Sequence, residues 1–194
     1  MLFRYFGQQA AWERKGFRFK MPIKLLDSTL VSLTISVYDW AHYTTSKGAV
    51  KMHTLLDYDC LLPEFMNITG GKRTDNKAAF DIEIKPHSIV VADRGYCDYG
   101  LLNYWDSNNV FYVGRHKDNI RYRTIEELPL PKQHTQNVLM DESIEFGLPA
   151  AKEKFPKRLK RIAVWNDEHG FVIELLTNNF TLAASTIAKL YKAR

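Results

Sequence analysis

The sequence predicts a mixed α/β fold, and three observations lead to this prediction. The apolar run Ser88–Ala92 ends at Asp93, which is typical of a strand buried on both faces of a sheet. Segments rich in β-branched residues precede this run, and a helical segment followed by another apolar strand comes after it. Because strands alternate with helices in this way, the pattern favours a mixed sheet with helices packed on it.

The part of the chain before Ser88 is expected to be mainly strand. Residues 23–38 alternate apolar with small polar side chains, which indicates one or two strands. The segments Gly48–Asp57 and Pro63–Thr69 repeat this pattern, and the glycine pair that follows ends the second of them. Short helices are expected over residues 1–13 and 75–82.

The part of the chain after Asp93 is expected to begin as α/β and to continue as mostly β. A helix over Tyr99–Ser107 leads to a strand over Val110–Val113. Residues 116–158 are interrupted by prolines and contain one expected strand, Val138–Phe146.

The last third of the chain is expected to end in a hairpin and a helix. The hairpin joins Leu159–Trp165 to Phe171–Thr177. The final helix covers Leu182–Arg194 with Thr181 as its N-cap, because apolar residues recur on one helical face.

Composition describes an ordinary globular protein. Of the 194 residues, 45% are apolar and 25% are charged, which excludes global disorder and collagen-like repeats. No apolar run is long enough to span a bilayer, and the N-terminus does not resemble a signal peptide. The two cysteines, Cys60 and Cys97, cannot form a disulfide framework, which indicates a reducing, cytosolic compartment.

Positive charge is concentrated late in the chain. The formal net charge is +5, which suits a phosphate-rich partner without identifying one. Residues 152–161 contain six cations and one acidic residue, Glu153. Two interpretations remain open: a solvated loop, or a surface that binds nucleic-acid phosphates. The cations of this basic run are Lys152, Lys154, Lys157, Arg158, Lys160 and Arg161.

Two aspartates occupy unusual positions. Asp27 interrupts an apolar strand and Asp93 closes the buried run. A carboxylate on a central strand is costly unless it is paired or binds a cation. If the two strands are neighbours, the carboxylates converge and hold Mg²⁺ or Mn²⁺ through oxygen ligands. The structural alternatives are that Asp93 pairs with Arg94 or caps the turn at Gly95, and that Asp27 bonds to a neighbouring hydroxyl.

Several sequence segments follow one another in a characteristic order. Asp27-Ser28-Thr29 is followed by Thr45–Leu56 and by Val90-Val91-Ala92-Asp93-Arg94-Gly95-Tyr96. Phe111–Asn119 and Leu176-Thr177-Asn178-Asn179-Phe180 come next, before Tyr191 and Arg194. In this order the segments resemble the DDE transposases of bacterial insertion sequences, in the group marked by a Tyr-x2-Arg-x3-Glu-x6-Lys signature, and the resemblance covers residues 23–194.

This resemblance implies an RNase H-like mixed sheet flanked by helices, with a β-rich insertion before the final helix. The domain boundaries expected from it are 1–22 for an N-terminal helix or linker, 23–115 for the core, 116–177 for the insertion and 178–194 for the start of the final helix. The implied function is metal-dependent DNA cleavage and strand transfer, assisted by two metal ions.

The resemblance also implies roles for particular residues. Asp27 and Asp93 would be the first and second catalytic aspartates and would hold Mg²⁺ or Mn²⁺. Tyr191 and Arg194 would contact DNA phosphates, and Arg94 would reach a phosphate or neutralise Asp93. The implied partner is DNA at the transposon ends and target, with a homodimer in the synaptic complex, in the bacterial cytoplasm at the nucleoid.

The signature continues beyond the printed sequence. Its glutamate falls four residues after the arginine, which here is Arg194, the last residue. We therefore expect this polypeptide not to complete transposition and to bind the metal weakly. The alternatives are a catalytically inactive DNA-binding fragment that modulates transposition, and another nuclease or recombinase of the same fold class with the same two aspartates.

Overall fold

The computed structural model describes residues 20–33, 48–116, 120–130 and 137–194. The chain divides into two compact units, residues 1–88 and 89–194. The helix expected over residues 1–13 and the strand residues after 33 lie outside the described parts. No helix among the described residues is both long and apolar enough to cross a membrane.

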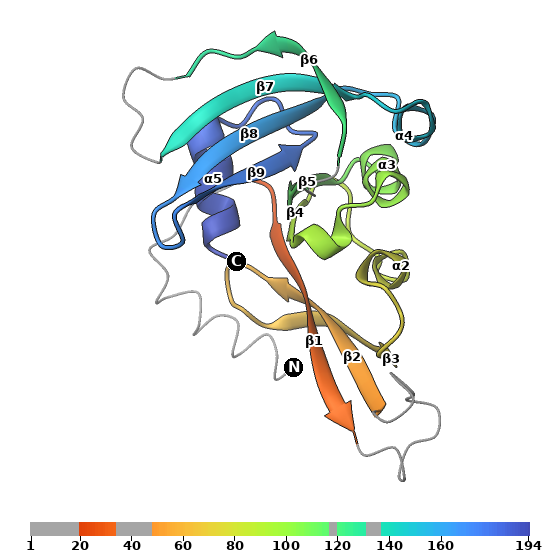
Figure 1. Cartoon of the computed structure of the whole chain (residues 1–194). Coiled ribbons are helices and arrows are strands. Elements are labelled where there is room, and N and C mark those ends of the chain that lie inside the picture. Colours follow the sequence, from red (N-terminus) through yellow and green to blue (C-terminus); the bar gives the residue numbers. More distant parts are fainter. Residues whose placement is uncertain (1–19, 34–47, 117–119, 131–136) are drawn as a thin grey trace. The chain divides into compact units, whose positions relative to one another are not determined.

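The first unit is an antiparallel three-stranded sheet with a short helix (Figure 1). β1 (Ile23–Leu33) pairs with β2 (Gly48–Asp57), which pairs with β3 (Pro63–Gly70). The helix α2 (Asp75–Ala79) contacts β2, and its residues Ala78 and Ala79 are buried. These elements confirm the predicted strands and the predicted short helix, which is shorter than the expected 75–82.

The second unit begins with a parallel βαβ arrangement. β4 (Ile89–Ala92) is buried at every residue, as the apolar run predicted. The 3-10 helix η3 (Arg94–Tyr96) and the helix α3 (Tyr99–Ser107) carry the chain to β5 (Phe111–Arg115), which pairs with β4 in parallel. Leu101, Leu102 and Trp105 of α3 are buried. The continuous apolar pattern therefore marks a parallel strand covered on both faces.

Antiparallel strands extend this sheet in the order β4-β5-β9-β8-β7-β6. They are β6 (Tyr122–Glu127), β7 (Val138–Phe146), β8 (Leu159–Asn166) and β9 (Phe171–Thr177). The strand β7 and the β8–β9 hairpin confirm the prediction. The edge strand β6 and the helix α4 (Pro149–Lys154) were not predicted.

The last helix, α5 (Ala184–Lys192), contacts β4, β5, β7 and β8. Ile187 and Leu190 are fully buried, in agreement with the predicted apolar face. The predicted N-cap Thr181 is wrong: the helix begins after Ala183 and has no side-chain cap. Instead the buried Asn179 side chain accepts hydrogen bonds from the backbone N–H groups of Thr181 and Leu182, each at 3.0 Å, and so shapes the turn into the helix.

The described elements form mixed α/β units with few helices, which confirms the predicted fold class. The predicted domain boundaries at residues 115 and 177 stay predictions.

Candidate active site around Asp93

Asp93 lies immediately after the buried strand β4, where the chain leaves the sheet. Its carboxylate Oδ1 accepts a hydrogen bond from the backbone N–H of Arg94 at 2.6 Å and caps η3. Its side chain is 46% exposed, although the four preceding residues are buried. The end of a parallel strand is where α/β sheets present ligand-binding groups. Asp93 therefore caps a turn and also presents a carboxylate to solvent.

The helix α5 brings two predicted site residues to this carboxylate. The Tyr191 hydroxyl donates to Oδ1 of Asp93 over 3.5 Å, and the Arg194 guanidinium lies 3.8 Å from the same oxygen. The Arg194 guanidinium carbon also lies 5.5 Å from the centre of the Tyr191 ring. Tyr191 lies in the last turn of α5, and Arg194 directly follows the C-cap Ala193, so the end of this helix places both side chains beside Asp93. Residues that are far apart in sequence thus form one group within the second unit.

The turn before α5 fixes where that helix starts. Asn178 accepts a hydrogen bond from the backbone N–H of Tyr112 at 3.0 Å and donates to Asp106 at 2.9 Å and to the Val110 carbonyl at 3.1 Å. These bonds tie the end of β9 to β5 and α3. The asparagine pair noted in the sequence therefore has a structural role: it sets the path by which α5 reaches Asp93.

Tyr191 is held in its protonated form. Burial raises the pKa of its hydroxyl, Arg194 and Arg115 oppose this shift, and the negative charge of Asp93 adds to it. A protonated phenol can donate a hydrogen bond to a carboxylate or to a phosphate oxygen.

Arg115 is a site residue that sequence reasoning did not select. It ends β5, the parallel neighbour of β4, and its charge acts on the Tyr191 hydroxyl. Its guanidinium carbon lies 5.4 Å from the centre of the Phe171 ring. Its position at the end of the strand beside β4 was the signal that could have identified it.

A hollow of about 390 Å³ adjoins Tyr191 in the second unit. The β8–β9 hairpin supplies Trp165 and Ile173, and α5 supplies Ala188, Tyr191 and Lys192. Trp165 is 40% exposed, so an aromatic surface lies near the Asp93 group.

Asp27 lies in the first unit, on an exposed part of β1. It pairs across the sheet with Thr54 of β2. Next to it, the Ser28 hydroxyl donates to Asp75 at 3.0 Å. Asp75 also pairs with Lys51 at 3.0 Å, so a charged network ties α2 to the first two strands. Because Asp27 and Asp93 belong to different units, their convergence on one metal ion stays a prediction.

Metal ligation depends on the donors present. Among the described residues, no group of three or more His, Cys, Asp or Glu side chains is arranged to hold a metal ion. The exposed carboxylate of Asp93 is nevertheless an oxygen donor of the kind that hard divalent cations prefer. It fits the role of a metal ligand that needs partners from elsewhere in the protein.

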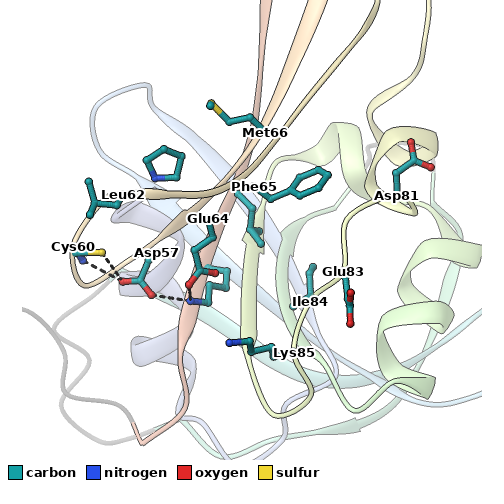
Figure 2. A pocket seen from close by; sticks show the side chains of 13 residues that line it. Asp57, Cys60, Leu62, Glu64, Phe65, Met66, Asp81, Glu83, Ile84 and Lys85 are labelled. Atoms are coloured by element: carbon teal, nitrogen blue, oxygen red, sulfur yellow. Dashed lines mark hydrogen bonds and ion pairs between the residues drawn. The ribbon is translucent and has the colours of Figure 1, made fainter. Parts of the chain in front are cut away.

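A hollow of about 1020 Å³ in the first unit does not include Asp27 (Figure 2). At its edge Lys24 is buried between Asp57 at 2.7 Å and Glu64 at 2.6 Å. Burial disfavours the charged ammonium, but these two hydrogen bonds outweigh it, and the pKa of Lys24 is raised. The Cys60 thiol donates to Asp57 over 3.3 Å, and burial raises its pKa. Lys24, Asp57, Glu64 and Cys60 therefore bond to one another at this hollow.

The basic run from Lys152 to Arg161 divides into an exposed part and a buried part. The side chains of Lys152, Lys157 and Arg158 are 52–60% exposed, and Lys154 is exposed as well. Lys160 is buried against Asp141 at 3.1 Å, and Arg161 is buried against Glu142 at 2.6 Å and also bonds to Glu174. Only the exposed part can present its charge to a large anion. Arg94 is also exposed, beside Asp93.

Comparisons with known proteins identify relatives of this chain. The chain is 27% identical over 181 residues to a protein of Geobacillus stearothermophilus named as a transposase for insertion sequence element IS5377, and covers 47% of it. It is 28% identical over 174 residues to a Sinorhizobium fredii protein named as transposase y4zB, and covers 48% of it. These matches take in 93% and 89% of this chain. The chain thus spans about half the length of the curated relatives it matches.

A solved structure is similar in fold. The cryo-EM structure of the piggyBac transposase synaptic complex with hairpin DNA matches with a TM-score of 0.51 and 10% sequence identity, over 88% of this chain and 37% of that one. This similarity agrees with the RNase H-like fold class. Residues 18–194 match the family model described as the transposase DDE domain, and the chain therefore belongs to the DDE transposase family.

Proposed function

We propose that this chain is the catalytic domain of a DNA transposase, which cleaves DNA strands and transfers them by metal-dependent phosphoryl transfer. The observation that carries the proposal is the meeting of Tyr191 and Arg194 with Asp93 at the end of β4. Family membership supports the reaction class. In this proposal the substrate is DNA at the element's ends and at the target.

Each residue has a stated role in this proposal. Asp27 and Asp93 supply carboxylate oxygens to Mg²⁺ or Mn²⁺. When bound, the metal activates the attacking water or 3′-hydroxyl and stabilises the leaving oxygen. Arg194 and the protonated Tyr191 bind and orient the phosphate group next to Asp93. Arg115 adds positive charge to the same place. Pairing of two copies in a synaptic complex stays a prediction.

The test is nicking of supercoiled plasmid DNA in the presence of Mg²⁺ or Mn²⁺. It uses the 194-residue chain and the same chain carrying any residues that its gene encodes after Arg194. The variant Asp93→Asn, made in the longer chain, keeps the turn but loses the carboxylate charge, and we expect it to abolish nicking. Asp59→Asn, an exposed aspartate in a turn of the first unit, is the matched control and should retain nicking. Equal nicking by both variants would contradict the catalytic role of Asp93.

A second candidate function is DNA binding without cleavage, which would modulate transposition. The exposed lysines of the basic run favour it, because they can bind phosphates independently of Asp93. The two functions separate in one experiment. If every form of the protein binds duplex DNA and none nicks it with either metal, the binding function is the better description.

A further inference from the structure

Glu145 lies at the centre of a cluster of cations on the second unit. It stands opposite Arg123 in the β6–β7 pairing. Ile144 of β7 pairs with Leu159 of β8, so the position next to Glu145 on the β8 side is Arg158. Arg123 therefore lies on one side of the Glu145 carboxylate and Arg158 on the other. A third cation, Lys152, reaches the same carboxylate from α4.

The distances show that all three cations share this carboxylate. Lys152 Nζ lies 2.9 Å from Oε2, Arg123 Nη2 lies 3.4 Å from the same oxygen, and Arg158 Nε lies 3.7 Å from Oε1. The hydrogen bond from Lys152 is the main reason that the pKa of Glu145 is lowered, and the charge of Arg123 adds to it. Glu145 is therefore ionised at neutral pH.

Exposure differs sharply between the carboxylate and the cations. The Glu145 side chain is 17% exposed, whereas those of Lys152, Arg158 and Arg123 are 52%, 56% and 70% exposed. Ion pairs between exposed side chains contribute little to stability, so each cation can leave Glu145 at small cost. The long side chains can then turn toward another anion at the surface.

Charge in this cluster is unbalanced. Three cations face one carboxylate, and the other two charged residues of α4, Glu153 and Lys154, are both exposed and balance each other. A surface with this excess of positive charge attracts a polyanion, and the contacts formed are with its phosphates rather than with particular bases.

We propose that Arg123, Lys152 and Arg158 form a binding surface for the DNA backbone, in which Glu145 competes with the phosphates for the three cations. This inference rests on the proposed function, since it takes duplex DNA as the partner. It adds Arg123, which lies outside the basic run, and it gives Glu145 a restraining role: the carboxylate keeps the surface partly neutral until DNA displaces it.

The experiment measures binding of a fluorescein-labelled duplex of arbitrary sequence by anisotropy over a range of KCl concentrations. Glu145→Gln should tighten binding by about three- to tenfold at low salt and steepen the salt dependence, because more cations become available to phosphates. Arg123→Gln should weaken binding and reduce the slope of log K against log salt by about 0.9.

Glu126→Gln is the matched control. Glu126 is exposed on the same strand as Arg123 and lies outside the ion-pair cluster, so this variant changes the net charge equally. If Glu145→Gln tightens DNA binding more than Glu126→Gln does, the result supports competition between Glu145 and the DNA phosphates. Tightening equal to the control, or weaker binding, would overturn it while leaving DNA binding itself intact.

The proposed function fails separately. If neither the wild type nor any variant binds the duplex, DNA binding by this chain is refuted, and the competition model falls with it. Circular dichroism and thermal unfolding of each variant establish that the protein remains folded, which is expected because all three cations are solvated.

Discussion

The side chains in and just after α4 are exposed at Lys152, Lys154 and Lys157. The strand β8, a few residues later, buries two further cations, Lys160 and Arg161. All five belong to one basic run in the sequence. The exposed Lys152 and Lys157 pair with Glu145 and Asp106, and water and salt ions can replace these contacts. The buried cations face carboxylates that have no such replacement. Neighbouring residues of one charge can therefore have opposite roles, one in binding and one in stability.

The largest expected effect comes from removing a buried cation. Arg161→Ala leaves Glu142 and Glu174 without their shared partner, and we expect the free energy of unfolding to fall by about 3–5 kcal/mol. Urea unfolding followed by circular dichroism measures it. Arg158→Ala, three residues earlier and exposed, should cost less than about 0.5 kcal/mol. Similar losses in both variants would remove the distinction between buried and exposed cations.

Lys160→Met should lower the free energy of unfolding by about 3 kcal/mol at neutral pH, because Asp141 is left charged and buried. Burial already raises the pKa of Asp141, and Lys160 partly offsets this. A carboxyl group whose pKa is raised in the folded state binds a proton more tightly there than in the unfolded state. The folded state therefore loses stability as the pH rises through the raised pKa and the buried carboxyl becomes charged.

The deficit of Lys160→Met relative to wild type should therefore shrink as the pH is lowered from 7 toward 4. Thermal unfolding across this range measures it. A deficit that is the same at every pH would mean that Asp141 is not the source of the loss.

Neutralising the exposed lysines should change binding rather than stability. With Lys152, Lys154 and Lys157 all changed to Gln, we expect the slope of log K against log salt for duplex DNA to fall by as much as about 2.7, or about 0.9 per phosphate contact. The free energy of unfolding should change little, since exposed ion pairs contribute little. An unchanged slope would show that this face does not contact DNA.

The smallest expected effect concerns Glu145 at acid pH. Its pKa is lowered chiefly by the hydrogen bond from Lys152, so the stability it contributes is present above its ordinary pKa and is lost as pH falls through the lowered value. In the Glu145→Gln variant, the melting temperature should therefore fall slightly less than in the wild type as the pH is lowered below 4.5. An identical acid limb in wild type and variant would show that the cluster adds nothing to stability.

Sequence patterns predicted the long, strongly patterned elements and missed the short polar ones. The buried strand β4 and the apolar face of α5 follow from hydrophobic periodicity alone. The edge strand β6 (Tyr122–Glu127) is mostly polar and exposed, so it carries little apolar alternation. The helix α4 begins with Pro149, and the prolines of this region predict an interrupted chain, although proline is well tolerated in the first turn of a helix.

Residue types and their spacing along the chain were enough to predict the fold class, the family resemblance and the choice of Asp93, Tyr191 and Arg194. The folded arrangement was needed to show that the end of α5 places Tyr191 and Arg194 beside Asp93, and that Arg115 acts on the same tyrosine. It also decided which cations of the basic run are buried and that Arg123 joins the exposed ones around Glu145. The physical reason is that burial and ion pairing arise from strand register and helix packing, which join residues far apart in the sequence.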